Sequence, residues 1–411
     1  MAHQPFKTQS KATCPILDLP VEIGRQLIQN IGSSADLHAL SLSCKAFTEI
    51  ARERIFEDIT LTSLRYEELR PNSVAITRLL GLSKMAVQTK YIKCISVRTV
   101  LPNLLVENDF SKDMQVILAE WLRQMPRLEK LVIGNVNLSE GLIVAILDIT
   151  SQQPLSLQLH KCAFSVFLLQ IPDVPIDIPE LDIPELDIQI WVEAAWLNQL
   201  TGVYSALERE SIAFAERLIF MARFNITTLK VDLNSPLALT TMLGSIFLPA
   251  LRAFECDSLI YTDKQLPAVM DGFLQRHSTI TSISLAGGNH PVKPLFSFPS
   301  LTQASPSLPN LQIIKTDSNL IHKLVPGRPV TEVSMTCVGP VGFHDGIRAL
   351  CHSKATIIKA SLVFSDGSDT WDQVIETLAE VTPSLQDLDL RTTSPPRGID
   401  VRVIWWTSSS I

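Results

Sequence analysis

The sequence lacks the features that mark membrane-spanning and secreted proteins. No apolar stretch among its 411 residues approaches the ~18 residues that cross a bilayer, and the leading segment MAHQPFKTQSKATC has no apolar core of the signal-peptide kind. Its seven cysteines are scattered and form no CxxC pair. Such cysteines are typical of reduced thiols, so we expect a protein of the cytoplasm or nucleus that does not contact a membrane.

Catalytic and metal-binding signatures are missing as well. The chain contains no GxSxG, GxxxxGKS/T, GxGxxG or HExxH motif. Its eight histidines do not pair with cysteines or acids at the spacing of metal ligands. We therefore expect no enzymatic activity, no metal and no other cofactor.

Positive charge is scarce, whereas apolar residues are plentiful. The 35 basic residues are outnumbered by 42 acidic ones, so the formal net charge is −7. An acidic chain with no long basic run is a poor match for nucleic acid. Because 46% of the residues are hydrophobic, the chain can bury a large core. Its length predicts about two or three domains, or one elongated array.

Three short helices are expected over residues 16–61, after a disordered tail over residues 1–15. Apolar residues from Leu19 to Ile31 recur mostly at steps of three and four, which places them on one side of a first helix. Gly32 breaks this helix, and two further short helical stripes follow. A unit of this size buries little apolar surface, so we expect it to need a partner or a neighbouring domain.

The order of residues over 17–61 resembles an F-box, and its last part, ARERIFEDITL, is similar to the tail that follows the F-box in many fungal proteins. Two positions depart from the pattern. Gly24 replaces an aliphatic residue and lowers helix propensity by about 1 kcal/mol relative to alanine, and Ser43 stands where valine is common. We expect both to weaken the interface; the alternative is a plain helical hairpin. The matching residues are Leu19, Pro20, Glu22, Ile23, Leu27, Ile28, Ile31, Asp36, Leu37, Leu40, Leu42, Cys44, Lys45 and Phe47.

The resemblance implies partners and a role. An F-box docks onto the Skp-family linker of a cullin-RING (SCF) ubiquitin ligase, and the domain behind it binds the protein to be modified. The chain would then be a substrate-recognition adaptor with a linker, a cullin and an unidentified protein substrate as partners. The alternative is a non-catalytic scaffold that uses the F-box or the repeats outside a ligase. The positions assigned to the linker interface or its supporting core are Leu19, Pro20, Ile23, Leu27, Leu37, Leu40 and Phe47.

A second pattern, apolar-x-x-apolar-x-apolar, recurs through residues 91–394 with helical stretches such as KDMQVILAEWLRQM and WDQVIETLAEV between its copies. Successive copies often start about 25 to 31 residues apart. A strand plus a helix at this period is typical of a leucine-rich-repeat solenoid. We therefore predict an α/β fold in which the F-box and a helical linker over 62–90 precede an irregular leucine-rich-repeat-like array. Its curved parallel sheet would carry outer helices, and an irregular tail would cover 395–411. The alternative is a general α/β domain with amphipathic helices.

The segment IPDVPIDIPELDIPELDIQI is expected to interrupt this array over residues 172–190. It contains the pentapeptide DIPEL twice in tandem, four prolines and six acids with no base. Proline forbids a helix and disfavours a central strand, so the pattern predicts an extended insertion. Two interpretations remain open: a slipped-repeat expansion with no role, and an acidic arm that docks a basic partner.

The concave surface of the array is the expected substrate-binding surface. In such a strand the apolar residues face the core and the alternate residues face the inner surface. These alternate residues are polar and of mixed charge, which predicts a folded protein or a mixed peptide as the ligand; the alternative is that they are merely solvated. Asp232, Glu255 and Asp257 come from adjacent copies and are expected to form a negative cluster. The candidate substrate-binding residues are His160, Lys230, Asp232, Glu255, Asp257, Asp387 and Asp389.

Overall fold

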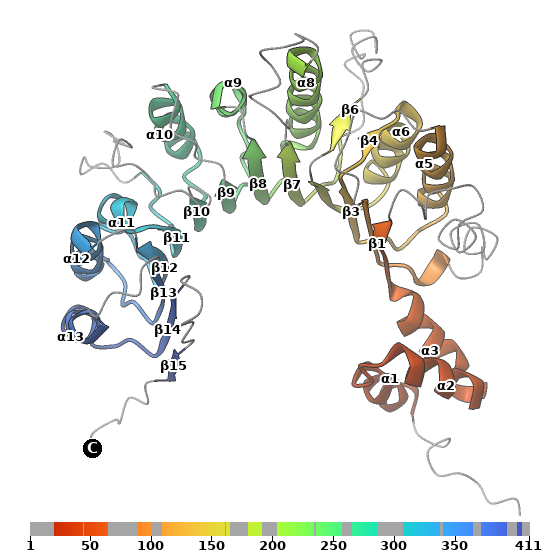
Figure 1. Cartoon of the computed structure of the whole chain (residues 1–411), viewed down its shortest axis with the longest axis horizontal. Helices are drawn as coiled ribbons and strands as arrows, with labels where there is room; N and C mark the ends of the chain where they lie inside the picture. Colours follow the sequence, from red (N-terminus) through yellow and green to blue (C-terminus); the bar gives the residue numbers. More distant parts are fainter. Residues whose placement is uncertain are drawn as a thin grey trace, which may run out of the picture.

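A computed structural model shows the chain as an arc, with strands on its inner side, helices on its outer side and three helices at the N-terminal end (Figure 1). The first residues, 1–15, lie outside the described part of the chain, as does the middle of the expected linker over 62–90. The structure describes residues 20–43, 45–64, 89–99, 109–160, 162–164, 180–190, 204–233, 236–256, 265–285, 307–337, 340–364, 371–392 and 401–404.

The N-terminal unit consists of α1 (Val21–Gln29), α2 (Ser34–Ser43) and α3 (Lys45–Glu57). The three helices enclose a small core of their own, to which each contributes buried apolar side chains. α3 ends at Glu57, and the next residue, Asp58, begins the first strand of the large sheet. The unit is therefore joined to the arc without a spacer. Its buried core residues are Ile28, Leu37, Phe47 and Ala51.

The arc is built on a 13-stranded sheet in which the strands follow one another in chain order. Twelve strands are parallel, and the last pairs antiparallel with its neighbour. Adjacent parallel strands need a crossover connection, which places the helices on the outer face (Figure 1). The strands are β1 (Asp58–Leu64), β2 (Cys94–Thr99), β3 (Lys130–Gly134), β5 (Ser156–His160), β7 (Glu185–Ile190), β8 (Thr228–Leu233), β9 (Ala253–Cys256), β10 (Ser282–Leu285), β11 (Ile313–Asp317), β12 (Glu332–Cys337), β13 (Lys359–Phe364), β14 (Asp387–Thr392) and β15 (Val401–Ile404).

The helices behind the sheet supply the other half of one continuous core. None of the helices in the described residues combines the length and apolar character that crossing a bilayer requires. The outer helices are α5 (Asp109–Leu122), α6 (Glu140–Thr150), α8 (Tyr204–Ala222), α9 (Pro236–Ser245), α10 (Leu266–Arg276), α11 (Ser318–Leu324), α12 (Pro340–Ala349) and α13 (Trp371–Val381), with short 3-10 turns at Thr89–Tyr91 and Leu350–His352.

Register aligns the strands so that one buried apolar residue from each forms a row behind the sheet. Because no single strand–helix unit can cover its own apolar face, each unit is stabilised by its neighbours. This α/β architecture, with a curved parallel sheet and outer helices, confirms the coarse prediction. The row reads Ile59, Ile95, Leu131, Leu157, Leu186, Leu229, Phe254, Ile283, Ile314, Val333, Ala360 and Leu388.

The expected insertion over 172–190 is wrong for its last eleven residues, which include a central strand of the sheet. β7 pairs with β5 on one side and β8 on the other. Proline is tolerated because Pro184 stands just before the strand, where its carbonyl accepts hydrogen bonds from the backbone N–H groups of Thr227 and Thr228 at 2.9 and 3.0 Å. Leu181 and Ile183 are buried. Residues 172–179 lie outside the described part of the chain.

Two other expected boundaries also differ from the structure. The strand β1 includes residues 62–64, which were expected to begin a helical linker, and it starts inside the expected F-box. β15 lies within the segment over 395–411 that was expected to be irregular, and it pairs with β14. The sheet therefore begins earlier and ends later in the chain than predicted.

The thiols that the structure describes, Cys94, Cys162, Cys256 and Cys351, are all free, in line with the expectation of reduced cysteines. Cys162 stands just before the short strand β6 (Ala163–Phe164), which pairs in parallel with β4 (Asn137–Leu138). Its Sγ donates to the carbonyl oxygen of Ile133 at 3.4 Å. Burial raises the pKa of this thiol to about 12, so the group acts as a structural donor and is not reactive.

Candidate protein-binding surfaces

The structure divides the predicted linker-binding residues into an exposed group and a buried group. On α1, Ile23 and Leu27 are 40% and 44% exposed, and Pro20 is exposed just before the helix. Leu37 and Phe47 are buried in the core of the N-terminal unit. The predicted residue Leu40 is half-buried against that core, and Leu19 lies outside the described residues.

Two further apolar side chains belong to the exposed group but were absent from the predicted site. Val21 on α1 is 55% exposed, and Leu42 on α2 is 88% exposed. Leu42 was part of the matching pattern, so the sequence contained a signal for it. Isolated exposed apolar residues need no explanation, but five exposed apolar residues on one small unit that already has a closed core are an unusual concentration. We call Pro20, Val21, Ile23, Leu27 and Leu42 the exposed apolar set.

Gly24, which was expected to weaken the interface, does not belong to that set. It is one of the two buried residues of α1. A Cβ atom at this position would lie 3.4 Å from Cε1 of Phe47 and 3.5 Å from Cδ1 of Ile50, which is ordinary van der Waals contact. Its effect is therefore on the stability of the unit.

The substitution Gly24→Ala is expected to stabilise the N-terminal unit by about 1 kcal/mol, since alanine is the better helix former and its methyl group fits. Hydrogen exchange of the α1 amides in the full chain should slow by about fivefold. The matched control is Gly141→Ala, at a helical glycine of α6 where an added methyl group would have nothing within 4 Å. That change should slow exchange in α6 alone. Faster exchange in α1 after Gly24→Ala would mean that the site cannot accept a methyl group.

Polar contacts join the N-terminal unit to the residues just before β2. The Tyr91 hydroxyl donates to Glu49 of α3, and the Lys93 ammonium lies 3.1 Å from Oε1 of Glu57. Partial burial raises the pKa of the Glu57 carboxyl, but hydrogen bonds from Arg54 and Lys93 outweigh it and leave that pKa below its usual value. The same pairing raises the pKa of Lys93. Both groups therefore remain charged near neutral pH.

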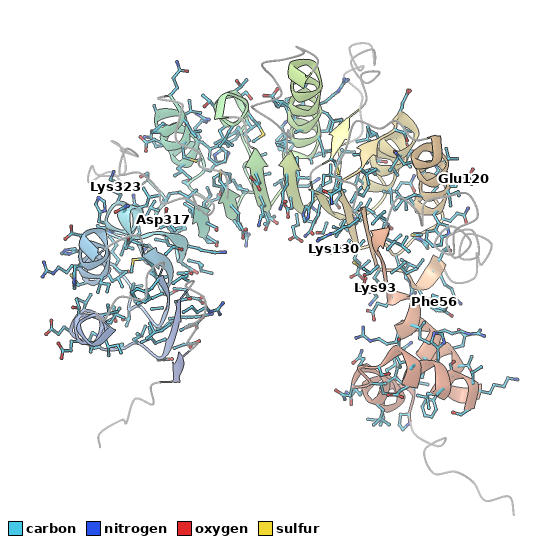
Figure 2. The ribbon with its side chains drawn as sticks, viewed as in Figure 1. Phe56, Lys93, Glu120, Lys130, Asp317 and Lys323 are labelled. Carbon is cyan, nitrogen blue, oxygen red and sulfur yellow. The ribbon has the colours of Figure 1, made fainter. Side chains whose placement is uncertain are left out.

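The second candidate surface is the inner side of the arc. Figure 2 shows Lys130 on the inner side and Glu120 on the outer side. In each strand the residues between the buried ones face inward, and register aligns them into rows across the sheet. The middle row reads, from β1 to β14, Thr60, Ser96, Val132, Gln158, Asp187, Lys230, Glu255, Ser284, Lys315, Ser334, Ser361 and Asp389.

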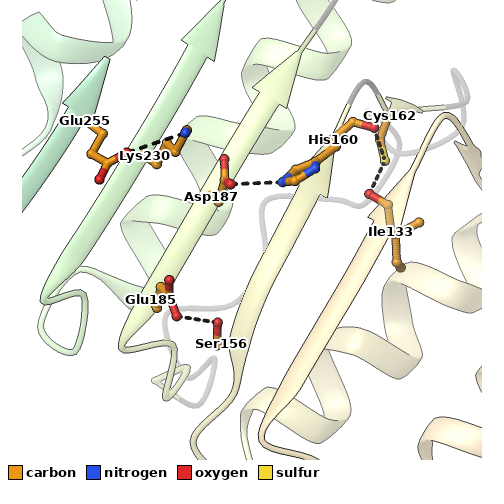
Figure 3. Close-up of polar contacts among 8 residues, drawn as sticks. All are labelled: Ile133, Ser156, His160, Cys162, Glu185, Asp187, Lys230 and Glu255. Atoms are coloured by element: carbon orange, nitrogen blue, oxygen red, sulfur yellow. Dashed lines mark hydrogen bonds and ion pairs between the residues drawn. The ribbon is translucent and has the colours of Figure 1, made fainter. Parts of the chain in front are cut away.

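Polar and charged side chains are paired between neighbouring strands on this surface. Nε2 of His160 lies 2.9 Å from Oδ2 of Asp187, and Nζ of Lys230 lies 3.4 Å from Oε2 of Glu255 (Figure 3). Further along the arc, Lys359 pairs with Glu332 at 3.5 Å. The surface is consequently polar and of mixed charge, as predicted.

The expected negative cluster of Asp232, Glu255 and Asp257 is altered by an ion pair. Glu255 is matched by Lys230, and Asp232 stands two residues further along β8 in a different row, opposite Gln189. The third member, Asp257, lies outside the described residues. The described residues therefore present a salt-bridged surface here, and they do not form a block of acids.

Asp387 and Asp389 occupy two rows of β14 on the same surface, and Asp389 pairs with Arg391 at 2.7 Å. With His160, Lys230, Asp232 and Glu255, they are the six predicted substrate-binding residues that the structure describes. They are spread over four strands, so only the ones on β5 to β9 lie near one another.

Asp187 is a concave residue that the prediction missed, because its strand was interpreted as an insertion. It is 8% exposed, and its Oδ1 atom accepts no hydrogen bond, while Oδ2 contacts His160. On the same strand, Glu185 accepts a hydrogen bond of 2.7 Å from the Ser156 hydroxyl (Figure 3). β7 thus places two carboxylates on the inner surface near the middle of the arc.

The described residues contain no group of three or more His, Cys, Asp or Glu side chains that could hold a metal ion. No protein-family model matches the chain, and no curated protein matches it significantly. The two surfaces are therefore the features from which a function can be inferred.

Proposed function

We propose that the chain is a substrate-recognition adaptor of a cullin-RING ubiquitin ligase. In this proposal the N-terminal unit is an F-box that binds a Skp-family linker, and the arc is a leucine-rich-repeat-like array that binds a protein substrate in the cytoplasm or nucleus. The observation that carries the proposal is the exposed apolar set. It lies on a helical unit with a closed core, and that unit is joined without a spacer to an arc lined with polar groups.

The proposed adaptor needs no catalytic group of its own. It holds the substrate near the ubiquitin-charged enzyme, and the high local concentration of the two raises the rate of ubiquitin transfer. The direct connection between α3 and β1, with the Lys93–Glu57 ion pair across it, supports this role because it limits how far the substrate can move from the linker. The lysine that accepts ubiquitin belongs to the substrate.

The test is affinity capture with the full chain from cell extract. Recovery of a Skp-family linker together with a cullin is the expected result. Recovery of the linker without a cullin would favour the alternative, a non-catalytic scaffold that uses the F-box outside a ligase. Recovery of neither protein would contradict the assignment of the N-terminal unit.

The concave surface supports a protein ligand of mixed charge. The buried Oδ1 atom of Asp187 lacks a hydrogen bond, so a donor brought by the ligand would add more there than at an already solvated group. The Lys230–Glu255 pair, on the next two strands of the sheet, offers both signs of charge beside Asp187.

Exchanging that ion pair, as Lys230→Glu with Glu255→Lys, is expected to reduce substrate capture at least tenfold. The pair itself is preserved, so stability should change by less than about 1 kcal/mol, whereas the charge pattern that the ligand meets is reversed. The matched control exchanges Arg123 and Asp148, which pair at 3.5 Å between α5 and α6 on the outer side. Proteins captured by each variant are quantified by mass spectrometry, with linker capture as the internal reference. Equal losses in both exchanges would remove the concave surface from consideration.

A further inference from the structure

Three consecutive outer helices end in a group of phenylalanine and arginine side chains. Phe220, Arg223 and Phe224 lie at the end of α8, Phe247 and Arg252 lie between α9 and β9, and Arg276 is the last residue of α10. In each repeat this is where the chain turns from the helix into the next strand. The six residues therefore lie along one edge of the arc, and we call them the arginine–phenylalanine edge.

The three rings are exposed although the core beneath them is complete. Phe220, Phe224 and Phe247 are 61%, 51% and 55% exposed, whereas Phe254 and Phe273 in the same repeats are fully buried. A soluble surface seldom keeps several exposed phenylalanines together unless something covers them. Phenylalanine and arginine are also enriched at the centres of protein interfaces.

Contacts within the edge hold several of these side chains in place. The Arg223 guanidinium lies 4.0 Å from the centre of the Phe220 ring and 4.5 Å from that of Phe224, and it donates to the Phe220 carbonyl oxygen at 2.9 Å. Arg276 donates to the carbonyl oxygen of Leu243 at 2.8 Å, which ties α10 to α9. A preformed surface loses little side-chain entropy when it binds a partner.

Phe247 is positioned by a buried histidine. Its ring lies 5.5 Å from the His277 ring, which accepts a hydrogen bond of 2.8 Å from the Leu248 N–H at Nε2. Nδ1 of His277 lies 2.7 Å from the Phe273 carbonyl oxygen, so the ring is held as the neutral tautomer that donates there. Burial lowers the pKa of His277, which keeps this arrangement neutral.

The edge is positively charged on a chain whose formal net charge is −7. Among the described residues, no carboxylate forms an ion pair with Arg223, Arg252 or Arg276. By contrast, Arg123 at the end of α5 pairs with Asp148. Unmatched guanidinium groups favour a carboxylate-bearing ligand, because each can bind a carboxylate through two N–H donors.

The spacing of the helices sets the size of the ligand. Packed helices lie about 8–10 Å apart, so three consecutive helices span about 20 Å. An extended chain covers about 3.3 Å per residue, so this span corresponds to about six residues. Nucleic acid is the poorer match, because the Arg223 guanidinium already occupies a face of two of the three rings on which bases would stack.

We propose that the arginine–phenylalanine edge docks an extended acidic segment of a partner protein, with carboxylates at the guanidinium groups and apolar side chains against the phenylalanine rings. This inference uses neither the N-terminal unit nor the concave surface, so it stands or falls independently of the proposed function.

The test uses the full chain and a fluorescein-labelled octapeptide, ELDELDEL, in fluorescence anisotropy. Saturable binding with a micromolar dissociation constant is expected, weakening with added salt. The neutral peptide QLNQLNQL and a ten-residue uridine RNA should bind at least tenfold more weakly. Equal binding of the neutral peptide, or tighter binding of the RNA, would overturn the proposal.

Substitutions then locate the binding site. Changing Arg223, Arg252 and Arg276 together to Gln should weaken peptide binding at least tenfold, and Phe220→Ser with Phe224→Ser should weaken it separately. Arg123→Gln is the matched control, at an arginine in the same position of a distant repeat, and should have no effect. Thermal unfolding verifies that each variant is folded. Unchanged peptide affinity in both sets of variants would show that the edge is not the binding site.

Discussion

Deleting residues 176–186 is expected to abolish cooperative unfolding of the arc or to lower its melting temperature by more than 10 °C. The deletion removes Leu181, Ile183 and Leu186, all buried, and brings Pro175 into the place of Leu186. Truncating one such side chain to alanine costs about 2–5 kcal/mol, and a whole domain is stable by only about 5–15 kcal/mol. Losing three of them together with the pairing of β7 should therefore separate the two halves of the sheet. Circular dichroism during heating measures the effect.

The matched control deletes residues 177–181, which is one copy of the DIPEL tandem. The chain from Asp182 onward is then unchanged, and Ile176 takes the place of Leu181. Exchanging leucine for isoleucine usually costs less than about 1.5 kcal/mol, so the melting temperature should fall by only a few degrees. The twelve residues left over 165–176 reach up to ~40 Å, which is ample for a crossover between neighbouring strands. Similar losses from both deletions would show that β7 does not hold the sheet together.

The second large effect is expected at the exposed apolar set. Ile23→Ala combined with Leu27→Ala should lower affinity for a Skp-family linker by more than a hundredfold. Each lost anchor at an interface centre can cost about 2 kcal/mol, and every 1.4 kcal/mol is a factor of ten. Alanine favours the helix, so far-UV circular dichroism and thermal unfolding of the chain should not change. Capture of purified linker by immobilised protein gives the affinity.

Two controls separate binding from folding in this experiment. Val144→Ala, at an exposed apolar residue of α6, should leave linker capture intact. Ile28→Ala, at the buried residue next to Leu27, should destabilise the N-terminal unit through its core. If the exposed double variant still captures the linker at full affinity, α1 does not provide the interface.

The sequence predicted the strands whose apolar pattern stood between helical stretches, including β3, β5 and β8. It missed β1 and β7 although both follow the same pattern, as Phe56-x-x-Ile59-x-Leu61 and Ile183-x-x-Leu186-x-Ile188 show. For β1, the resemblance to the F-box tail gave a competing interpretation. For β7, the prolines did. Proline is excluded only where its missing N–H is needed, which depends on register and therefore on tertiary contacts.

The two candidate surfaces were predictable only in part, because tertiary contacts also decide which of their residues are exposed or paired. Helical spacing placed Ile23, Leu27 and Ile28 on one stripe of α1, but only the packing of α3 decides that Ile28 faces the core and the other two face solvent. On the concave surface, alternation along the strands predicted which residues face inward. It did not predict that Lys230 neutralises Glu255, because that pair joins different repeats.

The tandem that precedes and enters β7 gives the chain a spare copy of one strand. The heptapeptide DIPELDI occurs at residues 177–183 and again at 182–188, so the two copies overlap by two residues. The two copies differ in the residues that follow them. Gln189 and Ile190 follow the second copy, which enters β7, whereas Pro184 and Glu185 follow the first. Replication slippage that removes or adds one unit of fifteen nucleotides would leave a complete strand in frame, with only the segment before the strand changed in length. The middle of the arc is thus the part of the protein whose gene can vary in length without losing a repeat.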